Sequence, residues 1–298
     1  MTDSHPLRFA QRSILEPPPA FGHSVTYRVA LEADPRKALA RLKEGFVPDW
    51  GVVGIGEPLA RLFGAEIDGL RPFPALAGPG QSVPSTQQAL WFMLRGADRS
   101  ATFDLAGKVA DMLEGPFVAH DPVDTFTYRE GRDLSGYVDG TANPSYDDSI
   151  GVAFVPSGAG LIGSSFVAVQ RWRHDLKQLA RHPSAERDAM VGRRIADNEE
   201  IAGAPPSAHV KRSEQEDYDP PAFMVRRSMP WAAGEANGLE FIAYGASPEA
   251  YERVMRRMLG LDDGVTDAIF KYSRATAGGY YWCPPIASGR LDLSRLGL

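Results

Sequence analysis

The stretch HSVTYRVAL, residues 23–31, decides the fold. Val25, Tyr27 and Val29 alternate in it with smaller or polar residues, which is the period-2 pattern of a half-buried strand. The residues that follow, Pro35 to Phe46, have the composition of a helix. The chain is therefore predicted to open with a strand followed by a helix.

Further signals complete a β-α-β-β-α-β order in the first half. A helix is predicted over Ser100–Glu114, with Ser100 as its cap and Gly115 as its end. The remaining strands are predicted at Gly51–Ile55, Ala89–Leu94 and Pro116–Ala119, with a Gly/Pro-rich connection running to Pro84. This order is that of a split βαβ, or ferredoxin-like, unit.

The order recurs after Gly151. We predict strands at Ser165–Arg171, Ala222–Met229 and Leu239–Tyr244, and helices at Arg173–Arg194, with a break near Pro183, and at Ser247–Gly260. The predicted fold class is α+β, with two ferredoxin-like halves that contain antiparallel sheets. The halves are residues 1–150 and 151–298, and the segment from Pro144 to Gly151 joins them.

Composition excludes several classes of function. The net charge of −6 gives no reason to expect nucleic acid or an anionic membrane as a partner. The single cysteine, Cys283, excludes an internal disulfide and a thiolate metal cage built from one chain. Met1 to Ser13 shows no export signal, and no apolar run approaches the roughly 20 residues that span a bilayer. We expect a cytoplasmic protein without a membrane partner.

The histidines lack the spacing of a zinc hydrolase, because none of the six forms an HxxxH or HExxH pattern. A lone histidine is enough for haem, which needs one axial donor from the protein. His174 and His182 stand among charges and are expected to be solvated on a helix. His209 differs, because it lies in a long irregular segment just before a strand that carries Arg226.

The second candidate is the run GYVDGTANP, residues 136–144. Glycines on both sides of Asp139 allow a positive φ or the close approach of a flat ligand, and would leave the carboxylate pointing into a cavity. A simple turn explains the same pattern. The residues alone leave both interpretations open.

Residues 136–140 resemble the GxxDG signature of the dye-decolorizing peroxidase family, and the continuation TANP also fits. Other stretches resemble the family in the same order: QRSIL at 11–15, PSTQ at 84–87, GSSFVAVQR at 163–171, the segment around His209, and TAGGYYWCP at 276–284. The resemblance covers nearly the whole chain. It implies a fold of the dimeric ferredoxin-like barrel type, with one haem b per chain lodged mainly in the second half.

The resemblance also implies roles for single residues. His209 would be the proximal ligand of the iron, Asp139 the distal acid–base residue and Arg226 the distal cation, which would keep Asp139 ionised by lowering its pKa. Ser228 is expected to be a third catalytic residue, but it is a departure, because some bacterial members carry asparagine at that position. Serine can still donate or accept a hydrogen bond but reaches less far, and it resembles the shorter bacterial subgroup.

Residues around the haem are expected to complete the site. Asp267 would accept a hydrogen bond from His209, with Asp262 and Asp263 as rivals. Cations that would bind the haem propionates are Arg193, Arg194 and Arg212.

The implied function is a haem-dependent peroxidase, which reduces hydrogen peroxide through an iron–oxo intermediate and oxidises dyes, phenols or other small organic reductants. One alternative is a haem-binding or haem-delivery protein with incidental peroxidase activity, and another is a haem-free ferredoxin-like module. We expect a homo-oligomer. The spaced leucines of residues 291–298 could dock into an encapsulating shell protein or onto the chain's own body.

Overall fold

The computed structural model describes residues 5–298; residues 1–4, the start of the segment in which we predict no export signal, lie outside the described part. The strands are β1 Phe21–Val29, β2 Gly51–Ile55, β3 Leu76–Gly78, β4 Gln81–Val83, β5 Leu90–Gly96, β6 Phe117–Phe126, β7 Ser165–His174, β8 Val225–Arg226, β9 Met229–Ala233, β10 Ala236–Gly245, β11 Ser273–Cys283, β12 Ile286–Ala287 and β13 Arg290–Leu291. The α-helices are α1 Arg36–Gly45, α2 Glu57–Leu62, α3 Arg99–Leu113, α4 Tyr146–Ala153, α5 Leu176–Ala180, α6 Ser184–Val191, α7 His209–Ser213 and α8 Glu249–Met258.

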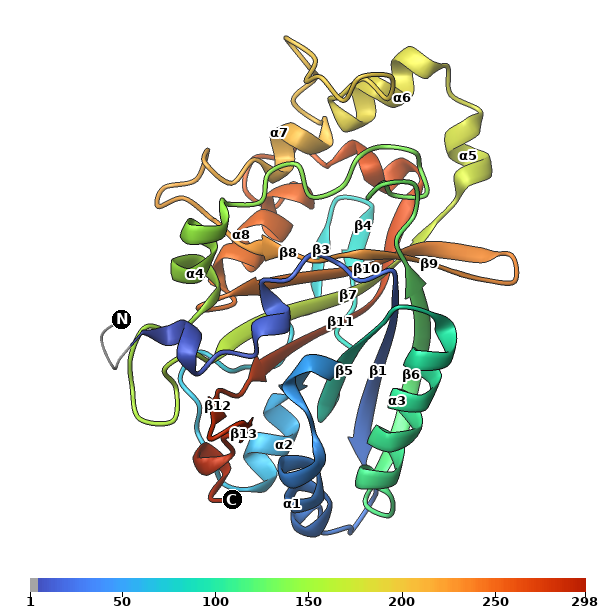
Figure 1. The fold of residues 1–298 in the computed structure, drawn as a ribbon. Coiled ribbons are helices and arrows are strands. Elements are labelled where there is room, and N and C mark those ends of the chain that lie inside the picture. The colour runs from blue at the N-terminus through green and yellow to red at the C-terminus, as the bar shows by residue number, and fades with distance from the viewer. Residues whose placement is uncertain (1–4) are drawn as a thin grey trace.

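The first half of the chain forms an antiparallel sheet with the order β2-β5-β1-β6. The opening strand pairs with β5 on one side, for example Val25 with Phe92, and with β6 on the other. Alternate residues of β1 and β5 pack against α1 and α3 in one hydrophobic core that contains Leu39, Leu42 and Val109. Figure 1 shows these helices in the lower part of the molecule, where the C-terminus also lies.

The second half repeats the arrangement with the order β11-β7-β10-β9, again antiparallel. Helix α8 covers one face of this sheet, and α5, α6 and α7 lie beyond it (Figure 1). The residues of β7 alternate between two environments. Val167 and Val169 face the first sheet together with Trp91, whereas Trp172 packs with residues of α8.

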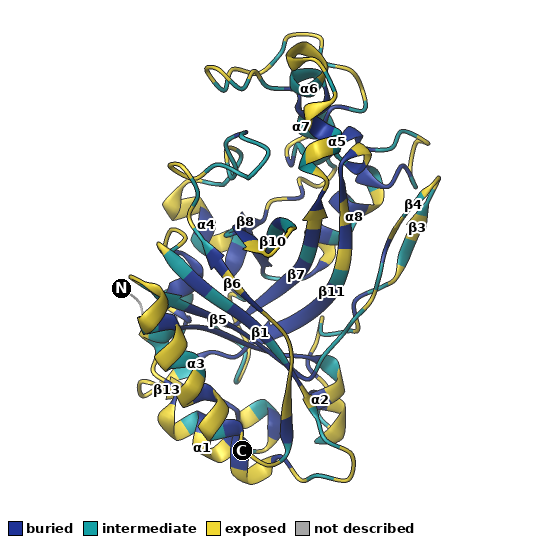
Figure 2. Cartoon of the chain, turned by 90° about the vertical axis from the view of Figure 1, so that its right-hand side faces the viewer, coloured by how far each residue is buried: buried dark blue, intermediate teal, exposed yellow. Residues whose placement is uncertain are grey.

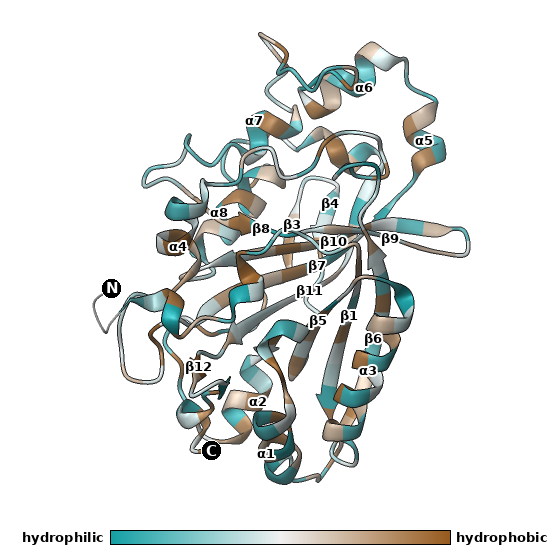
Figure 3. Cartoon of the chain, in the orientation of Figure 1, coloured by the Kyte–Doolittle hydropathy of each residue, from teal (hydrophilic) through white to brown (hydrophobic). Residues whose placement is uncertain are grey.

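The two sheets close on one another as a barrel. One edge is joined by the pair Trp282 and Ile55, and the other by Thr125 and Trp231. The central strands are largely buried, as β5 and β7 show in Figure 2, and hydrophobic segments run along them in Figure 3. The predicted α+β fold with ferredoxin-like halves and antiparallel sheets is confirmed.

The narrow seam between β2 and β11 is reinforced by a side chain from the N-terminal arm. The Gln11 amide donates to the backbone oxygens of Val53, at 3.0 Å, and Pro284, at 2.9 Å, and accepts from the Val53 N–H at 2.9 Å. Gln11 is fully buried. These bonds replace the backbone ladder that the single strand pair does not provide.

Several local predictions were wrong. Helix α3 is capped by Asp98, whose carboxylate accepts from the Ala101 N–H at 2.8 Å, and not by Ser100. The predicted linker from Pro144 to Gly151 contains most of α4, which Ser145 caps.

Within residues 5–298, no helix is long and apolar enough to cross a membrane.

Candidate active site

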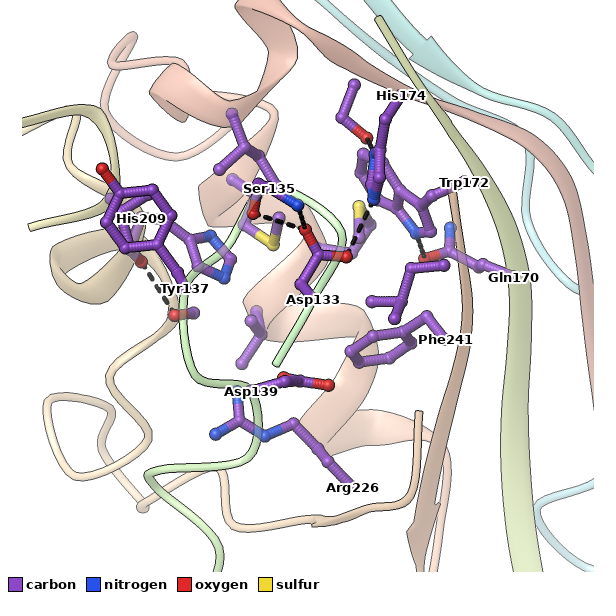
Figure 4. Close-up of a pocket in the computed structure, with 18 of the residues that line it drawn as sticks. Asp133, Ser135, Tyr137, Asp139, Gln170, Trp172, His174, His209, Arg226 and Phe241 are labelled. Atoms are coloured by element: carbon purple, nitrogen blue, oxygen red, sulfur yellow. Dashed lines mark hydrogen bonds and ion pairs between the residues drawn. The ribbon is translucent and has the colours of Figure 1, made fainter. Parts of the chain in front are cut away.

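A cavity lies between the outer face of the second sheet and α8, with about 970 Å³ of space that no atom fills, its open side included. Most of its wall is apolar and comes from β10, α8 and the segment that follows α8, including Leu239, Phe241, Val254, Met255, Met258 and Ile269. Figure 4 shows the polar residues that face it.

His209 enters the cavity from the first turn of α7. Its Nδ1 lies 2.7 Å from Oδ2 of Asp267, a carboxylate with 1% of its surface exposed. Because a carboxylate only accepts, Nδ1 carries the proton and Nε2 keeps a lone pair. Nε2 has no partner among residues 5–298. His209 can therefore hold a metal at Nε2.

The carboxylate that contacts His209 is Asp267, which the sequence had favoured over Asp262 and Asp263. Asp262 pairs with Arg256 and Asp263 with Arg212. Asp267 lies just before a short 3-10 helix, Ala268–Lys271, and its Oδ1 accepts from the Ile269 N–H at 2.9 Å. Burial alone would lower the pKa of His209, but the Asp267 carboxylate outweighs burial and the pKa is raised.

Asp139 lies on the loop between β6 and α4 and lines the same cavity. Gly136 and Gly140 on either side have positive φ angles of 95° and 76°, which suit glycine. The Asp139 carboxylate accepts from the Gly140 N–H at 2.7 Å. The glycines thus do what the pattern suggested: they turn the loop so that a buried acid faces the cavity.

Arg226 lies on β8 and faces the cavity beside Asp139 (Figure 4). Its guanidinium has no hydrogen-bond or ion-pair partner among residues 5–298, and its Nε is buried. Arg226 as a whole is half-buried, and a cation that loses part of its hydration without gaining a partner is costly, which indicates that this end of the cavity accommodates an anionic or strongly polar group.

Two amide side chains hold the Asp139 loop against β8. Asn143 accepts from the Arg226 N–H at 2.7 Å and donates to the Arg226 carbonyl at 3.1 Å. Gln215 donates to the Ala142 carbonyl at 2.8 Å and accepts from the Met224 N–H at 2.7 Å. The sequence analysis included Asn143 in the motif but missed this role, because the register between the loop and β8 is a tertiary feature.

The electrostatic balance at Asp139 differs from the expectation. Burial raises the pKa of Asp139, and Arg226 lowers it by less, so that the net direction is upward. Burial likewise lowers the pKa of Arg226. Arg226 lowers the pKa of Asp139, as predicted, but burial outweighs this effect, because the carboxyl group is removed from water and no direct ion pair joins the two side chains.

The other predicted site residues lie around this centre at different distances. Ser228 lines a second hollow that shares Asp139 and Arg226, and its hydroxyl accepts from the Ile242 N–H at 3.3 Å. Arg193 lines a third hollow together with His209, Asp139 and Arg226, and is bound by Glu200 and the Asn198 carbonyl.

Arg194 and Arg212 line none of these three hollows. Arg194 is bound by Asp197 and Glu199 at the surface. Arg212 is buried, donates to both oxygens of Asp263 at 2.7 Å and also donates to the Arg257 carbonyl at 2.6 Å. The structure therefore does not bring these two cations to His209.

His174 is a cavity residue that the sequence analysis placed elsewhere. It was expected to be solvated on a helix, but it ends β7 with 9% of its surface exposed. Its Nε2 lies 3.0 Å from Oδ2 of Asp133, and its Nδ1 lies 2.7 Å from the Ser273 hydroxyl. The expectation failed because β7 extends three residues beyond the predicted strand.

No group of three or more histidine, cysteine or acidic residues in the described chain is arranged to hold a metal ion. In one class of enzyme, a single residue ligates the metal of a bound organic cofactor. The cavity matches this class, because it has one free histidine nitrogen on one side and a buried acid with a buried arginine on another. Haem peroxidases belong to this class.

Comparison with known proteins identifies the family. The family model described as "Dyp-type peroxidase, C-terminal" matches residues 130–288. A dye-decolorizing peroxidase of Mycobacterium tuberculosis is 32% identical over 244 residues, which cover 79% of this chain and 73% of that protein. A dye-decolorizing peroxidase of Brevibacterium linens is 30% identical, over 95% of this chain and 83% of its own.

A solved structure agrees. A variant of DypB from Rhodococcus jostii RHA1, in complex with heme, superimposes with a TM-score of 0.85 and 26% identity, over 92% of this chain and 96% of that one. The chain belongs to the Dyp-type peroxidase family. It is a peroxidase of the dye-decolorizing type, as the sequence motifs predicted.

Proposed function

We propose that the cavity holds one haem b per chain, that His209 would bind its iron, and that Asp139 and Arg226, which line the same cavity, would act on hydrogen peroxide. One observation carries the proposal. The same cavity contains a histidine with a free Nε2, fixed by a buried carboxylate, and an acid beside a cation that has no partner.

The residues fit the cofactor. The apolar wall suits a flat, largely hydrophobic ring, and the unpartnered Arg226 and the neighbouring Arg193 supply positive charge for carboxylates or for peroxide. Arg194 and Arg212 would have to leave Asp197, Glu199 and Asp263 before they could bind a propionate. Arg193 is also paired, with Glu200 at 3.3 Å, but unlike Arg194 and Arg212 it lines a hollow that contains His209. We therefore propose Arg193 as the propionate anchor and give Arg194 and Arg212 the role of holding their own segments.

Bound haem would supply a redox-active iron that accepts the oxidising equivalents of peroxide. Ionised Asp139 would accept a proton from one peroxide oxygen and deliver it to the other oxygen, which leaves as water. Arg226 stabilises the negative charge that develops on that oxygen. The raised pKa of Asp139 makes it a stronger base, at the cost of being protonated at a higher pH than an ordinary aspartate.

Ser228 lies at the edge of the group formed by Asp139 and Arg226. Its hydroxyl is engaged with the Ile242 N–H and lines the hollow behind Asp139 and Arg226. We propose that it shapes and polarises the approach to Asp139 without transferring a proton itself.

The test is the rate at which the haem-loaded protein reacts with hydrogen peroxide, measured by stopped flow in wild type and in Asp139→Asn. General acid–base groups contribute about 10²–10⁴-fold, and a loss in that range is expected. Asp148→Asn, which alters an exposed acid in the first turn of α4, should react as wild type does. An unchanged rate in Asp139→Asn would contradict the assigned role.

A haem-delivery function is not favoured, because a carrier has no task for a buried acid and a buried cation in the cavity. The relatives are named as dye-decolorizing peroxidases, which supports dyes and small phenols as the reductants. We further propose a cytoplasmic homo-oligomer organised as halves 1–150 and 151–298. The buried free thiol of Cys283 is compatible with a reducing compartment.

A shell protein as a partner meets a specific obstacle. Leu291, Leu293 and Leu296 are buried in the first hydrophobic core, and Arg295 donates to the Glu66 carbonyl at 2.7 Å. Docking of this segment into a shell would require these residues to leave the core. Co-purification of the shell protein with the full chain but not with a chain that lacks residues 293–298 would support that partner; equal association would refute it.

A further inference from the structure

The position of Asp139 depends on its loop, and little else fixes its side chain. Among residues 5–298 the one hydrogen bond to its carboxylate comes from the adjacent Gly140 N–H. The Asp139 N–H donates to the Gly131 carbonyl at 3.1 Å, across a narrow turn. Whatever fixes the backbone of residues 131–143 therefore decides where the acid points.

The loop is fixed to the second sheet on both sides of Asp139. Downstream, Asn143 exchanges two hydrogen bonds with the backbone of Arg226. Upstream, Asp133 contacts His174 on β7, and His174 contacts Ser273 on β11. Figure 4 shows Asp133 and His174 together at one end of the cavity and Asp139 with Arg226 at the other.

Each atom of the upstream contact has a defined task. Oδ1 of Asp133 accepts from the Ser135 N–H at 2.7 Å and from the Ser135 hydroxyl, which shapes the turn. Oδ2 accepts from His174, so Nε2 carries the ring proton. Nδ1 of His174 meets the hydroxyl of Ser273, which is 4% exposed. The ring thus cannot rotate without breaking a buried hydrogen bond.

We propose that Asp133, His174 and Ser273 form a positioning chain that holds the Asp139 loop over the cavity, so that His174 sets the orientation of the catalytic acid. The inference rests on the role proposed above for Asp139. His174 is a positioning residue, because it acts on peroxide through Asp133 and the loop.

Physical chemistry favours this role over simple stabilisation. A buried pair of polar side chains is seldom more stabilising than apolar side chains of the same volume, but its hydrogen bonds fix direction. The wall around His174 is otherwise suited to apolar packing, with Trp172 and Tyr272 as neighbours. The negative charge of Asp133 also contributes to the raised pKa of Asp139, which shows that the two acids are electrostatically linked.

The experiment compares His174→Ala, His174→Gln and wild type as haem-loaded proteins. The first readout is amide hydrogen exchange in residues 131–140, with residues of β5 as the internal reference. We expect exchange in the loop to rise about tenfold or more in His174→Ala, with β5 unchanged, because one anchor of the loop is lost. His174→Gln retains an N–H donor that can reach Asp133 and should restore most of the protection.

The second readout is the rate of reaction with hydrogen peroxide. It should fall about tenfold or more in His174→Ala, in line with the cost of a misplaced catalytic group, and recover in His174→Gln. His182→Ala is the matched control, since His182 forms an exposed pair with Glu186 at 3.0 Å, and it should match wild type in both readouts. If His174→Ala does not fold, Ser273→Ala decides, with a smaller rise in loop exchange expected.

The outcomes separate cleanly. Unchanged loop exchange in His174→Ala, or exchange that rises equally in β5, overturns the positioning role. A normal peroxide rate in Asp139→Asn overturns the role of Asp139. The positioning chain is then tested by hydrogen exchange in the loop alone. Slow reaction in Asp139→Asn together with normal exchange and normal rates in His174→Ala overturns this inference alone.

Discussion

Replacing Asp267 with asparagine separates the two tasks of this carboxylate. Oδ2 accepts from His209 Nδ1 at 2.7 Å, and Oδ1 accepts from the Ile269 N–H at 2.9 Å. Asparagine has the same shape and caps a helix about as well as aspartate, so the Ile269 contact is retained. The charge opposite His209 is lost, and so is the acceptor, because the second polar group of asparagine is an NH₂ that only donates.

The expected effect is large on the cofactor and small on folding. Loss of an outer partner of a metal-ligating histidine costs about 10–100-fold in metal affinity or activity, which corresponds to about 1.4–2.7 kcal/mol. His209 becomes a weaker donor, so the ferric form loses more stabilisation than the ferrous form. The reduction potential of the bound iron should therefore rise, by about 59 mV for each tenfold difference between the two forms.

Two measurements check this: spectroelectrochemical titration of the loaded protein, and the rate of haem transfer to an excess of a tight-binding acceptor. Asp262→Asn serves as the control, because Asp262 pairs with Arg256 at 2.9 Å at the surface. The reasoning is refuted if Asp267→Asn keeps the wild-type potential and transfer rate, or if Asp262→Asn changes them equally.

Two further predictions concern charge and stability. Because Arg226 lowers the pKa of Asp139, Arg226→Gln should raise that pKa further. The reaction requires the ionised acid, so the acid limb of the pH–rate profile should move to higher pH. An acid limb that stays in place or moves to lower pH contradicts the assignment. Gln11→Ala leaves three buried backbone groups at the β2–β11 seam unsatisfied and should cost about 2–4 kcal/mol in the free energy of unfolding. Urea titration of Gln11→Ala measures this loss, with Arg12→Ala, a change at an exposed neighbour, as the control. Equal urea midpoints in the two variants would show that Gln11 does not support the seam.

The fold was predictable where the pattern of burial is local. The strand Gly51–Ile55 has the predicted bounds, because all five residues are buried and glycine and tryptophan mark its start. Closure of the barrel was not predictable from residue patterns alone. It depends on single strand pairs at the seams and on Gln11, a polar residue whose partners lie 42 and 273 positions away.

The candidate site was likewise predictable only in part. The glycines beside Asp139 and the irregular segment around His209 carry signals in the sequence, and the structure brings both residues to one cavity. His174 carries no such signal, since its neighbours Arg173 and Asp175 are charged and its burial follows from the pairing of β7 with β11. The propionate cations were also beyond prediction, because an arginine can be bound by the acids of its own segment, as Arg194 is.

The central claim is that His209 holds the metal of the cofactor. The most direct test is the ultraviolet–visible spectrum of haem-reconstituted wild type and His209→Ala, before and after one equivalent of hydrogen peroxide. The account predicts a histidine-ligated ferric spectrum in wild type that changes on addition of peroxide, and a spectrum in the variant that lacks this ligation and this response. Identical spectra in the two proteins, with the same response to peroxide, would contradict the assignment of His209.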